Sequence, residues 1–288
     1  MDNQHDWAVW IKAAIAEFVA GPENILGGSF GDESAWAEPL VGFANGADPL
    51  WSLYKEVVGP FHWTPKELFD LAFPAEDVAP EALTAISWVL PQTMATKETN
   101  RMQTRVPAER WARSRVFGEQ FNDKLRQHVV DALTGAGCLS VAPMLCSEWR
   151  SVDSDKYVYA STWSERHTAY AAGLGTFGLC DGLITPAGKA MRVGSVVARL
   201  SISPTPRPYT QHQEYCLFYT QGICAKCVDR CPAGALSARG HDKVKCSEYM
   251  NRVTKPYVME HYGFDGYGCG LCQTGVPCES RIPTASDL

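Results

Sequence analysis

The first 100 residues contain no arginine, and no part of the chain has an apolar run near the roughly 20 residues of a membrane-spanning helix. The start of the chain has no basic segment followed by a long apolar stretch, so no secretory signal is expected. Eleven cysteines in 288 residues are too few for a disulfide scaffold. These absences predict a cytoplasmic protein, in which thiols stay reduced.

The formal net charge of −6 is unevenly distributed. Residues 1–100 carry a net charge of −11, and residues 101–288 carry +5. An acidic face could dock a redox partner and a basic face could bind an anionic ligand, although solvated faces without a partner explain the pattern equally well. A phosphate-bearing ligand or solvent alone could account for one group of arginines: Arg101, Arg105, Arg110, Arg113, Arg115 and Arg126.

The apolar pattern mixes helical and strand periods. Spacings of three and four predict helices at 7–19, 49–58, 117–133 and 165–174, and Thr64, Pro65 and Glu67 mark another helix start. Compact apolar runs predict strands at 39–44, 85–90 and 138–143, and a hairpin is expected from residues 183–185 and 194–203. The mixed order predicts an α+β sheet domain over residues 1–210.

The last quarter of the sequence is organised by cysteine. It contains two Cys-x-x-Cys pairs, and one of them runs into Cys-x-x-x-Cys-Pro. Iron–sulfur clusters need four thiolates each, so eight suit two [4Fe–4S] clusters. The eight are Cys216, Cys224, Cys227, Cys231, Cys246, Cys269, Cys272 and Cys278.

A regular two-cluster run would have a cysteine where Gln221 stands, and Cys216 is the natural replacement. The crossover rule assigns cluster one to Cys216, Cys224, Cys227 and Cys278, and cluster two to Cys231, Cys246, Cys269 and Cys272. Residues 211–288 are therefore expected to form a ferredoxin-like domain that metal binding helps to fold. Two four-cysteine zinc sites are the alternative. The remaining thiols are expected to be buried or incidental: Cys138, Cys146 and Cys180.

Three segments resemble the epoxyqueuosine reductase family and its relatives, the cobalamin-dependent iron–sulfur reductases that include reductive dehalogenases. These are ERHTAYAAGLGTFG followed by LITP, CAKCVDRCPAGAL, and YGCGLC with the trailing Cys278. The resemblance extends over residues 85–288. It implies a nitroreductase-like α+β domain that binds cobalamin, followed by a ferredoxin-like domain with two [4Fe–4S] clusters. It also implies a low-potential electron donor of the ferredoxin or flavodoxin type.

The resemblance also implies site residues. The family's catalytic aspartate lies six residues before the Glu-Arg pair, where this chain has Tyr159, which could donate a proton as a tyrosine does in reductive dehalogenases. Tyr157 competes for this role, and a tyrosine that merely packs in a strand is a further reading. The cofactor-binding candidates are Glu165, Arg166, Gly173 and Gly175.

The resemblance favours an oxidoreductase that passes electrons through two clusters to cobalamin and reduces a small organic substrate. A ferredoxin-like electron carrier, or a reactivator of corrinoid proteins without its own substrate, is the alternative. The chain is shorter than typical epoxyqueuosine reductases and acidic overall, so neither nucleic acid nor a membrane is expected as a partner.

Overall fold

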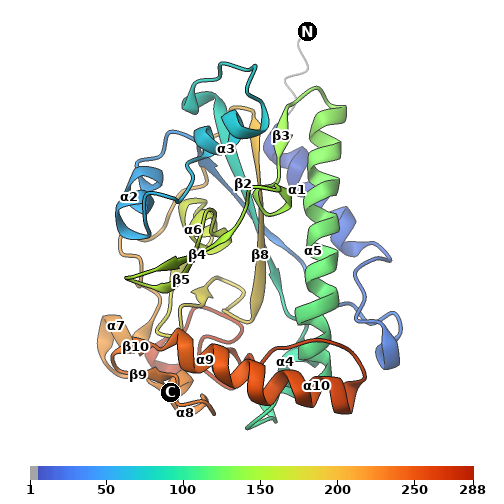
Figure 1. Ribbon diagram of the computed structural model, residues 1–288, viewed down its shortest axis with the longest axis vertical. Helices are drawn as coiled ribbons and strands as arrows, with labels where there is room; N and C mark the ends of the chain where they lie inside the picture. Colours follow the sequence, from blue (N-terminus) through green and yellow to red (C-terminus); the bar gives the residue numbers. More distant parts are fainter. Residues whose placement is uncertain (1–5) are drawn as a thin grey trace.

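The structure is a computed structural model that describes residues 6–288. Its centre is a four-stranded antiparallel sheet with the strand order β1-β2-β8-β3 (Figure 1). β2 pairs with β8 along its whole length, and all nine residues of β2 are buried. The mixed helix-and-sheet architecture expected from the sequence is therefore confirmed. The strand bounds are β1 Leu40–Asn45, β2 Leu83–Pro91, β3 Ser140–Val141 and β8 Met191–Arg199.

Helices cover both faces of this sheet. On one face, α1 (Trp7–Ala20) and the long α5 (Glu109–Gly135) pack their apolar stripes against Trp88 of β2 (Figure 1). Trp163, just before α6, belongs to the core of the other face. That second face is covered by three shorter helices: α2 Leu50–Val57, α3 Pro65–Ala72 and α6 Glu165–Ala171.

Helix starts follow the sequence signals. The Asp6 carboxylate accepts a hydrogen bond from the Val9 amide at the start of α1. α3 begins with a complete capping box, in which the Thr64 hydroxyl and the Glu67 carboxylate each accept from the other's backbone amide. The predicted helices and this helix start are confirmed.

The predicted hairpin of residues 183–185 and 194–203 is wrong. β7 (Leu183–Ile184) pairs with β6 (Thr176–Phe177), whereas β8 lies inside the main sheet between β2 and β3. β8 is apolar on both faces, which suits an interior strand. At Gly194 a side chain would lie 2.4 Å from the Trp88 indole, so the glycine lets the two central strands pack closely.

The cysteine-rich segment lies at one end of the molecule, where α7 to α10 gather (Figure 1). Its strands are two residues long, as expected for a segment with little core of its own. Its elements are α7 Leu217–Gln221, α8 Lys226–Asp229, β9 Leu236–Ser237, β10 Gly240–His241, α9 Lys243–Tyr249, a π-helical turn Met250–Thr254 and α10 Lys255–Tyr262. Elsewhere lie α4 Met94–Arg101 and the hairpin strands β4 Ser151–Ser154 and β5 Val158–Ser161.

Hydrogen bonds fasten this segment to the sheet domain. The Lys189 amide donates to the Cys278 carbonyl at 2.9 Å, and the Ala190 amide donates to the Glu279 carbonyl at 3.3 Å. Arg101 of α4 pairs with the buried Glu279 carboxylate, with Nη2 and Oε1 2.5 Å apart. Among residues 6–288, no helix has the length and apolarity needed to cross a bilayer.

Candidate functional site

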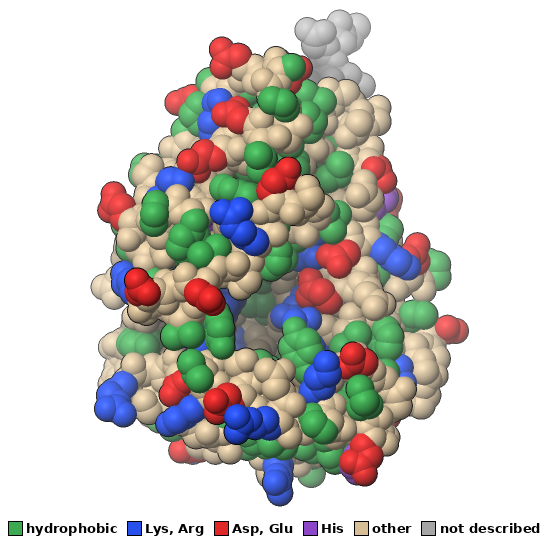
Figure 2. Space-filling model, in the orientation of Figure 1, with side chains coloured by type: hydrophobic (Ala, Val, Ile, Leu, Met, Phe, Trp, Pro, Cys, Tyr) green, Lys and Arg blue, Asp and Glu red, His purple; other side chains and the backbone are tan. Residues whose placement is uncertain are grey.

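A cavity of about 1,100 Å³ opens between α2, the β4–β5 hairpin, α6 and residues 210–220. Figure 2 shows a hollow in the middle of this face, bordered by hydrophobic side chains and by Lys and Arg. Ordinary small-molecule pockets measure roughly 300–1,000 Å³, so this cavity suits a large ligand.

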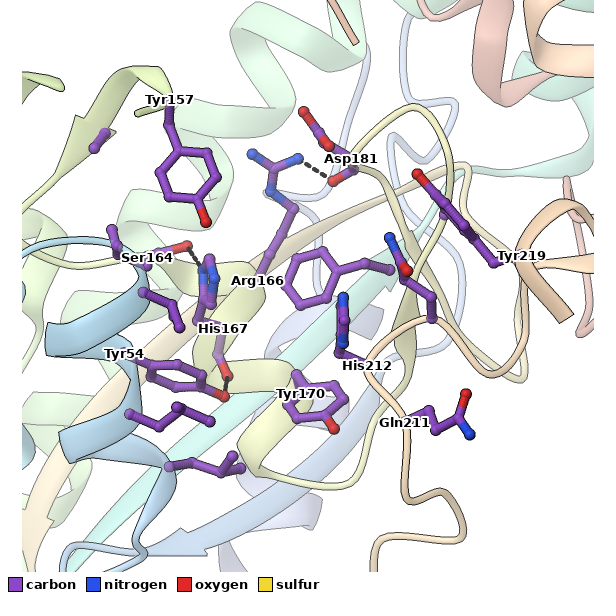
Figure 3. Close-up of a pocket in the computed structure, with 18 of the residues that line it drawn as sticks. Tyr54, Tyr157, Ser164, Arg166, His167, Tyr170, Asp181, Gln211, His212 and Tyr219 are labelled. Atoms are coloured by element: carbon purple, nitrogen blue, oxygen red, sulfur yellow. Dashed lines mark hydrogen bonds between the residues drawn. The ribbon is translucent and has the colours of Figure 1, made fainter. Parts of the chain in front are cut away.

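The walls combine aromatic, aliphatic and polar side chains, with few charges. Arg166, Asp181 and Lys243 are the charged side chains in the lining. Such walls offer flat apolar surfaces to a ring system, while a few polar groups can fix its orientation. The aromatic lining consists of Tyr54, Tyr157, Tyr159, Tyr170, Phe177 and Tyr219; Figure 3 labels Tyr54, Tyr157, Tyr170 and Tyr219.

α6 divides its residues between the cavity and the protein interior. Arg166, His167 and Tyr170 line the cavity, and Arg166 donates to the Asp181 carbonyl (Figure 3). Because a helix turns once per 3.6 residues, Glu165 lies on a different face. Its carboxylate accepts from Ser195 Oγ at 2.5 Å and from Arg126 Nε at 3.2 Å.

Glu165 therefore lies outside the cavity lining. Burial raises the pKa of the Glu165 carboxyl to about 7, although Arg126 and Ser195 act in the opposite direction. Arg126 itself is buried and also pairs with Glu119 and Asp123. This network holds α6 to α5 and β8.

Gly173 and Gly175 also lie outside the cavity lining. Gly173 has a φ of +78°, and a side chain there would meet the Pro206 carbonyl. A side chain at Gly175 would lie 2.2 Å from the Ile184 carbonyl. Both glycines allow one stretch of backbone to pack closely against another, and of the four cofactor-binding candidates only Arg166 reaches the cavity.

His167 is a cavity residue that the sequence analysis did not single out. Its Nδ1 lies 2.7 Å from Ser164 Oγ, and its carbonyl accepts from the Tyr54 hydroxyl (Figure 3). Burial lowers the pKa of His167 to about 3, with His62 and Arg166 adding to the effect. The ring is therefore neutral at neutral pH.

Both candidate tyrosines, Tyr157 and Tyr159, line the cavity from the hairpin. The Tyr157 ring points toward the side where Ser164 and His167 lie (Figure 3). Lys243 Nζ lies 5.4 Å from the centre of the Tyr157 ring and donates to the Tyr159 carbonyl at 3.1 Å. The Tyr159 side chain is 44% exposed. A cation is thus close to the Tyr157 ring and to the Tyr159 backbone.

A second, small cavity is lined by the four cysteines assigned to cluster one: Cys216, Cys224, Cys227 and Cys278. Leu179, Ile184 and Val276 complete much of its wall, so it is an apolar hollow with four sulfur ligands. This donor set fits an iron–sulfur cluster.

The cysteines assigned to cluster two lie in a second neighbourhood. Burial raises the pKa of Cys269 to about 11, and the nearby Cys246 and Cys231 contribute. Cys272 is half-buried, and its pKa is raised by its contact with Cys180 and by burial, with Cys269 also contributing. Within residues 6–288, no three or more His, Cys, Asp or Glu side chains converge on a single-ion site. A four-iron cluster, in contrast, distributes four cysteines over several irons.

Cys180 was expected to be buried or incidental, and it is buried, but it is not isolated from the other cysteines. It is buried within hydrogen-bonding reach of Cys227 and Cys272, which are assigned to different clusters, and Lys189 Nζ donates to its sulfur at 3.4 Å. Burial lowers the pKa of Lys189, but the surrounding thiolates more than offset this and raise it well above the usual range. A buried ammonium needs negative charge nearby, so its surroundings fit metal-bound thiolates.

Five of the six arginines in the group, all except Arg105, have ion pairs with carboxylates. Arg110 pairs with Glu33, and Arg113 pairs with Glu109. Arg101, Arg115 and Arg126 also lie within ion-pair distance of carboxylates. This supports the solvated or structural reading of the group over the phosphate-binding one.

Curated relatives match part of the chain. An epoxyqueuosine reductase of Bacillus anthracis is 33% identical over 120 residues, which are 40% of this chain and 29% of that protein. A tetrachloroethene reductive dehalogenase of Desulfitobacterium hafniense is 33% identical over 122 residues, or 41% of this chain and 21% of that protein. The chain thus matches less than a third of the length of either relative. No family model matches the chain.

Solved structures share the fold. The match to a catabolic reductive dehalogenase covers 97% of this chain and 38% of the dehalogenase chain, with a TM-score of 0.50 and 14% identity. The match to an epoxyqueuosine reductase, solved with a modified tRNA stem loop, covers 94% of this chain and 66% of the reductase chain, with a TM-score of 0.49 and 19% identity. The resemblance read from the motifs is confirmed: the curated proteins that this chain is similar to include epoxyqueuosine reductases and reductive dehalogenases.

Proposed function

We propose that this protein is an iron–sulfur oxidoreductase that delivers electrons to a cobalamin in the large cavity and reduces a small organic substrate there. One observation carries the proposal: the aromatic cavity and the cysteine-lined cavity are neighbours. Gly178, Tyr219 and Thr220 line the former, while Leu179 and Phe218 line the latter. Adjacent residues thus serve both cavities from the same two stretches of chain.

The order of electron transfer follows from this adjacency. Cluster one would lie next to the large cavity, and the cysteines assigned to cluster two include Cys231, which follows α8, and Cys246 of α9. A low-potential donor of the ferredoxin or flavodoxin type would reduce cluster two, and cluster one would receive the electron next. Cys180, in reach of cysteines from both groups, lies between them.

Cobalamin, when bound, supplies a low-potential cobalt centre for reductive chemistry. The chain's part is to hold and orient it. Tyr54, Tyr170 and Phe177 offer aromatic faces, and Arg166 and Lys243 offer hydrogen-bond donors. Glu165, Gly173 and Gly175 would act indirectly, by fixing α6 and the turn after it.

The reaction also needs a proton. Tyr157 and Tyr159 are proposed as alternative donors, because a phenol hydroxyl can donate a proton and both residues line the cavity. Lys243, close to the Tyr157 ring, would stabilise a phenolate there once the proton has left. Neutral His167 carries no spare proton at that pH, and its contact with Ser164 serves to fix its ring.

Anaerobic reconstitution tests the proposal in two steps. Two [4Fe–4S] clusters require about eight iron and eight sulfide per chain. The loaded protein should then bind one cobalamin, seen by equilibrium titration of its visible spectrum. Ala160→Trp, which fills the large cavity, should abolish binding, whereas Val9→Trp on the exposed side of α1 should not.

Each step has its own failure. About two zinc ions in a colourless protein would refute the redox function. Full clusters without cobalamin binding would leave an electron carrier or a reactivator of corrinoid proteins. The RNA seen with one relative makes a modified tRNA stem loop the second substrate class to test, after small organic compounds.

A further inference from the structure

Lys189 is a buried cation in the wall of the cluster-one cavity. Its side chain lines that cavity together with Cys216, Cys227 and Cys278, and the residue is only 2% exposed. Its Nζ lies 3.4 Å from the Cys180 sulfur. The cysteines that act on this ammonium are Cys180, the cluster-one cysteines Cys227 and Cys278, and the cluster-two cysteine Cys272.

The backbone fixes this position. Thr185 and Gly188 close a tight turn through two mutual hydrogen bonds, and Lys189 follows with its amide bonded to the Cys278 carbonyl. Gly188 has a φ of +84°, and a side chain there would lie 2.2 Å from the Glu279 carbonyl. The close approach of these two backbone segments, residues 188–189 and 278–279, therefore holds the lysine next to a cysteine assigned to cluster one.

A cation in this place acts on electron affinity. Reduction adds one negative charge to an iron–sulfur cluster, and a nearby positive charge stabilises the reduced form more than the oxidised form. Solvent screens this effect for exposed charges far more than for buried ones. Lys226, which adjoins Cys227 in the chain, is an exposed cation and provides a natural comparison.

We propose that Lys189 is the counter-charge of cluster one and raises its reduction potential, so that cluster one accepts the electron that enters through cluster two. This rests on the cluster function proposed above. The step is a one-electron transfer in which cluster two is oxidised and cluster one is reduced, and the external donor restores cluster two. Lys189 gains and loses no proton in it.

The test is a redox titration of the reconstituted protein, followed by electron paramagnetic resonance of the reduced clusters. Lys189→Met and Lys189→Gln remove the charge, Lys189→Arg retains it, and Lys226→Met removes a comparable exposed charge. We expect one midpoint potential to fall in the Met and Gln variants, while the other cluster, the Arg variant and the Lys226 variant stay close to the wild type. Cys180→Ala should retain all eight irons.

The outcomes separate this inference from the function on which it rests. A wild-type protein without iron and sulfide refutes the cluster function itself. Full clusters with unchanged potentials in both charge-removed variants overturn only the role of Lys189. An equal fall of the midpoint potential in Lys189→Arg or in Lys226→Met also overturns the role of Lys189, because the change in potential would then not depend on the buried charge. Loss of a cluster in both charge-removed variants would make Lys189 an assembly residue instead.

Discussion

Glu165 Oε1 lies 3.2 Å from Arg126 Nε, so one of the charged residues in the family-like motif is turned into the protein. Its pKa of about 7, raised by burial, lies above the ordinary value of 4.5. The folded state therefore takes up a proton that the unfolded state releases. The resulting stabilisation is complete below about pH 4.5 and is lost as the pH rises through about 7.

Glu165→Gln should remove this dependence. We expect the free energy of unfolding of the wild type to fall relative to that of the variant between pH 5 and pH 8, by at most about 3 kcal/mol. Anaerobic urea unfolding at both pH values measures the difference. The exposed Glu148→Gln is the control, and a wild type that runs parallel to Glu165→Gln would show that Glu165 is ionised throughout.

Tyrosine variants test the proton donor. Tyr157→Phe and Tyr159→Phe each remove one hydroxyl and keep the ring in the cavity wall. Loss of a general acid costs roughly 100-fold or more in turnover, so one variant should slow substrate reduction by this factor while iron content and cobalamin binding stay unchanged. Single-turnover kinetics of both variants measures the effect. Wild-type rates in both, and in the double variant, would exclude both tyrosines.

Gly175→Ala should destabilise the protein. The added methyl group would lie 2.2 Å from the Ile184 carbonyl, so the backbone must move, at a cost of about 1–3 kcal/mol. Gly135 at the end of α5 has open space around it, and Gly135→Ala should be neutral or slightly stabilising. Urea midpoints compare the two. If both variants are equally stable, the close packing at Gly175 does not contribute to the free energy of unfolding.

The iron content of cysteine variants should depend on whether the replaced cysteine is assigned to a cluster. Cys216→Ala removes a ligand assigned to cluster one, and Cys246→Ala removes one assigned to cluster two, so each should lower the iron content by about half. Cys138→Ala, outside both groups, should retain all the iron. Iron and sulfide analysis after reconstitution provides the measurement. Full iron in the Cys216 variant would mean that Gln221 or Cys180 replaces it as ligand.

Local signals predicted much of this fold. The stripe of α1 and the capping box of α3 are encoded by neighbouring residues, and the buried run of β2 is continuous. Strand partners depend instead on contacts between distant segments, so the expected hairpin of β7 and β8 was wrong. The β4–β5 hairpin was not predicted because its exposed strands lack apolar alternation.

The candidate site shows the same division. Cysteine spacing pointed to the two groups directly, because ligand spacing is a local property. Cys180 and Lys189 lie far upstream in the sequence, and no spacing connects them to the cysteines that they approach. His167 adjoins Arg166 in the motif, but only the direction of α6 shows that both face the cavity and that Glu165 does not.

The bonds from Lys189 and Ala190 to the backbone of residues 278 and 279 have a consequence for kinetics. These hydrogen bonds attach the cysteine-rich segment to the sheet domain. We therefore expect the cluster-one cavity and the large cavity to stay at a fixed distance from each other. Electron transfer from cluster one to the large cavity would then occur over a constant distance and would not require a domain motion. We expect its transfer rate to be insensitive to solvent viscosity, and arrival of the external donor to be the only diffusive step.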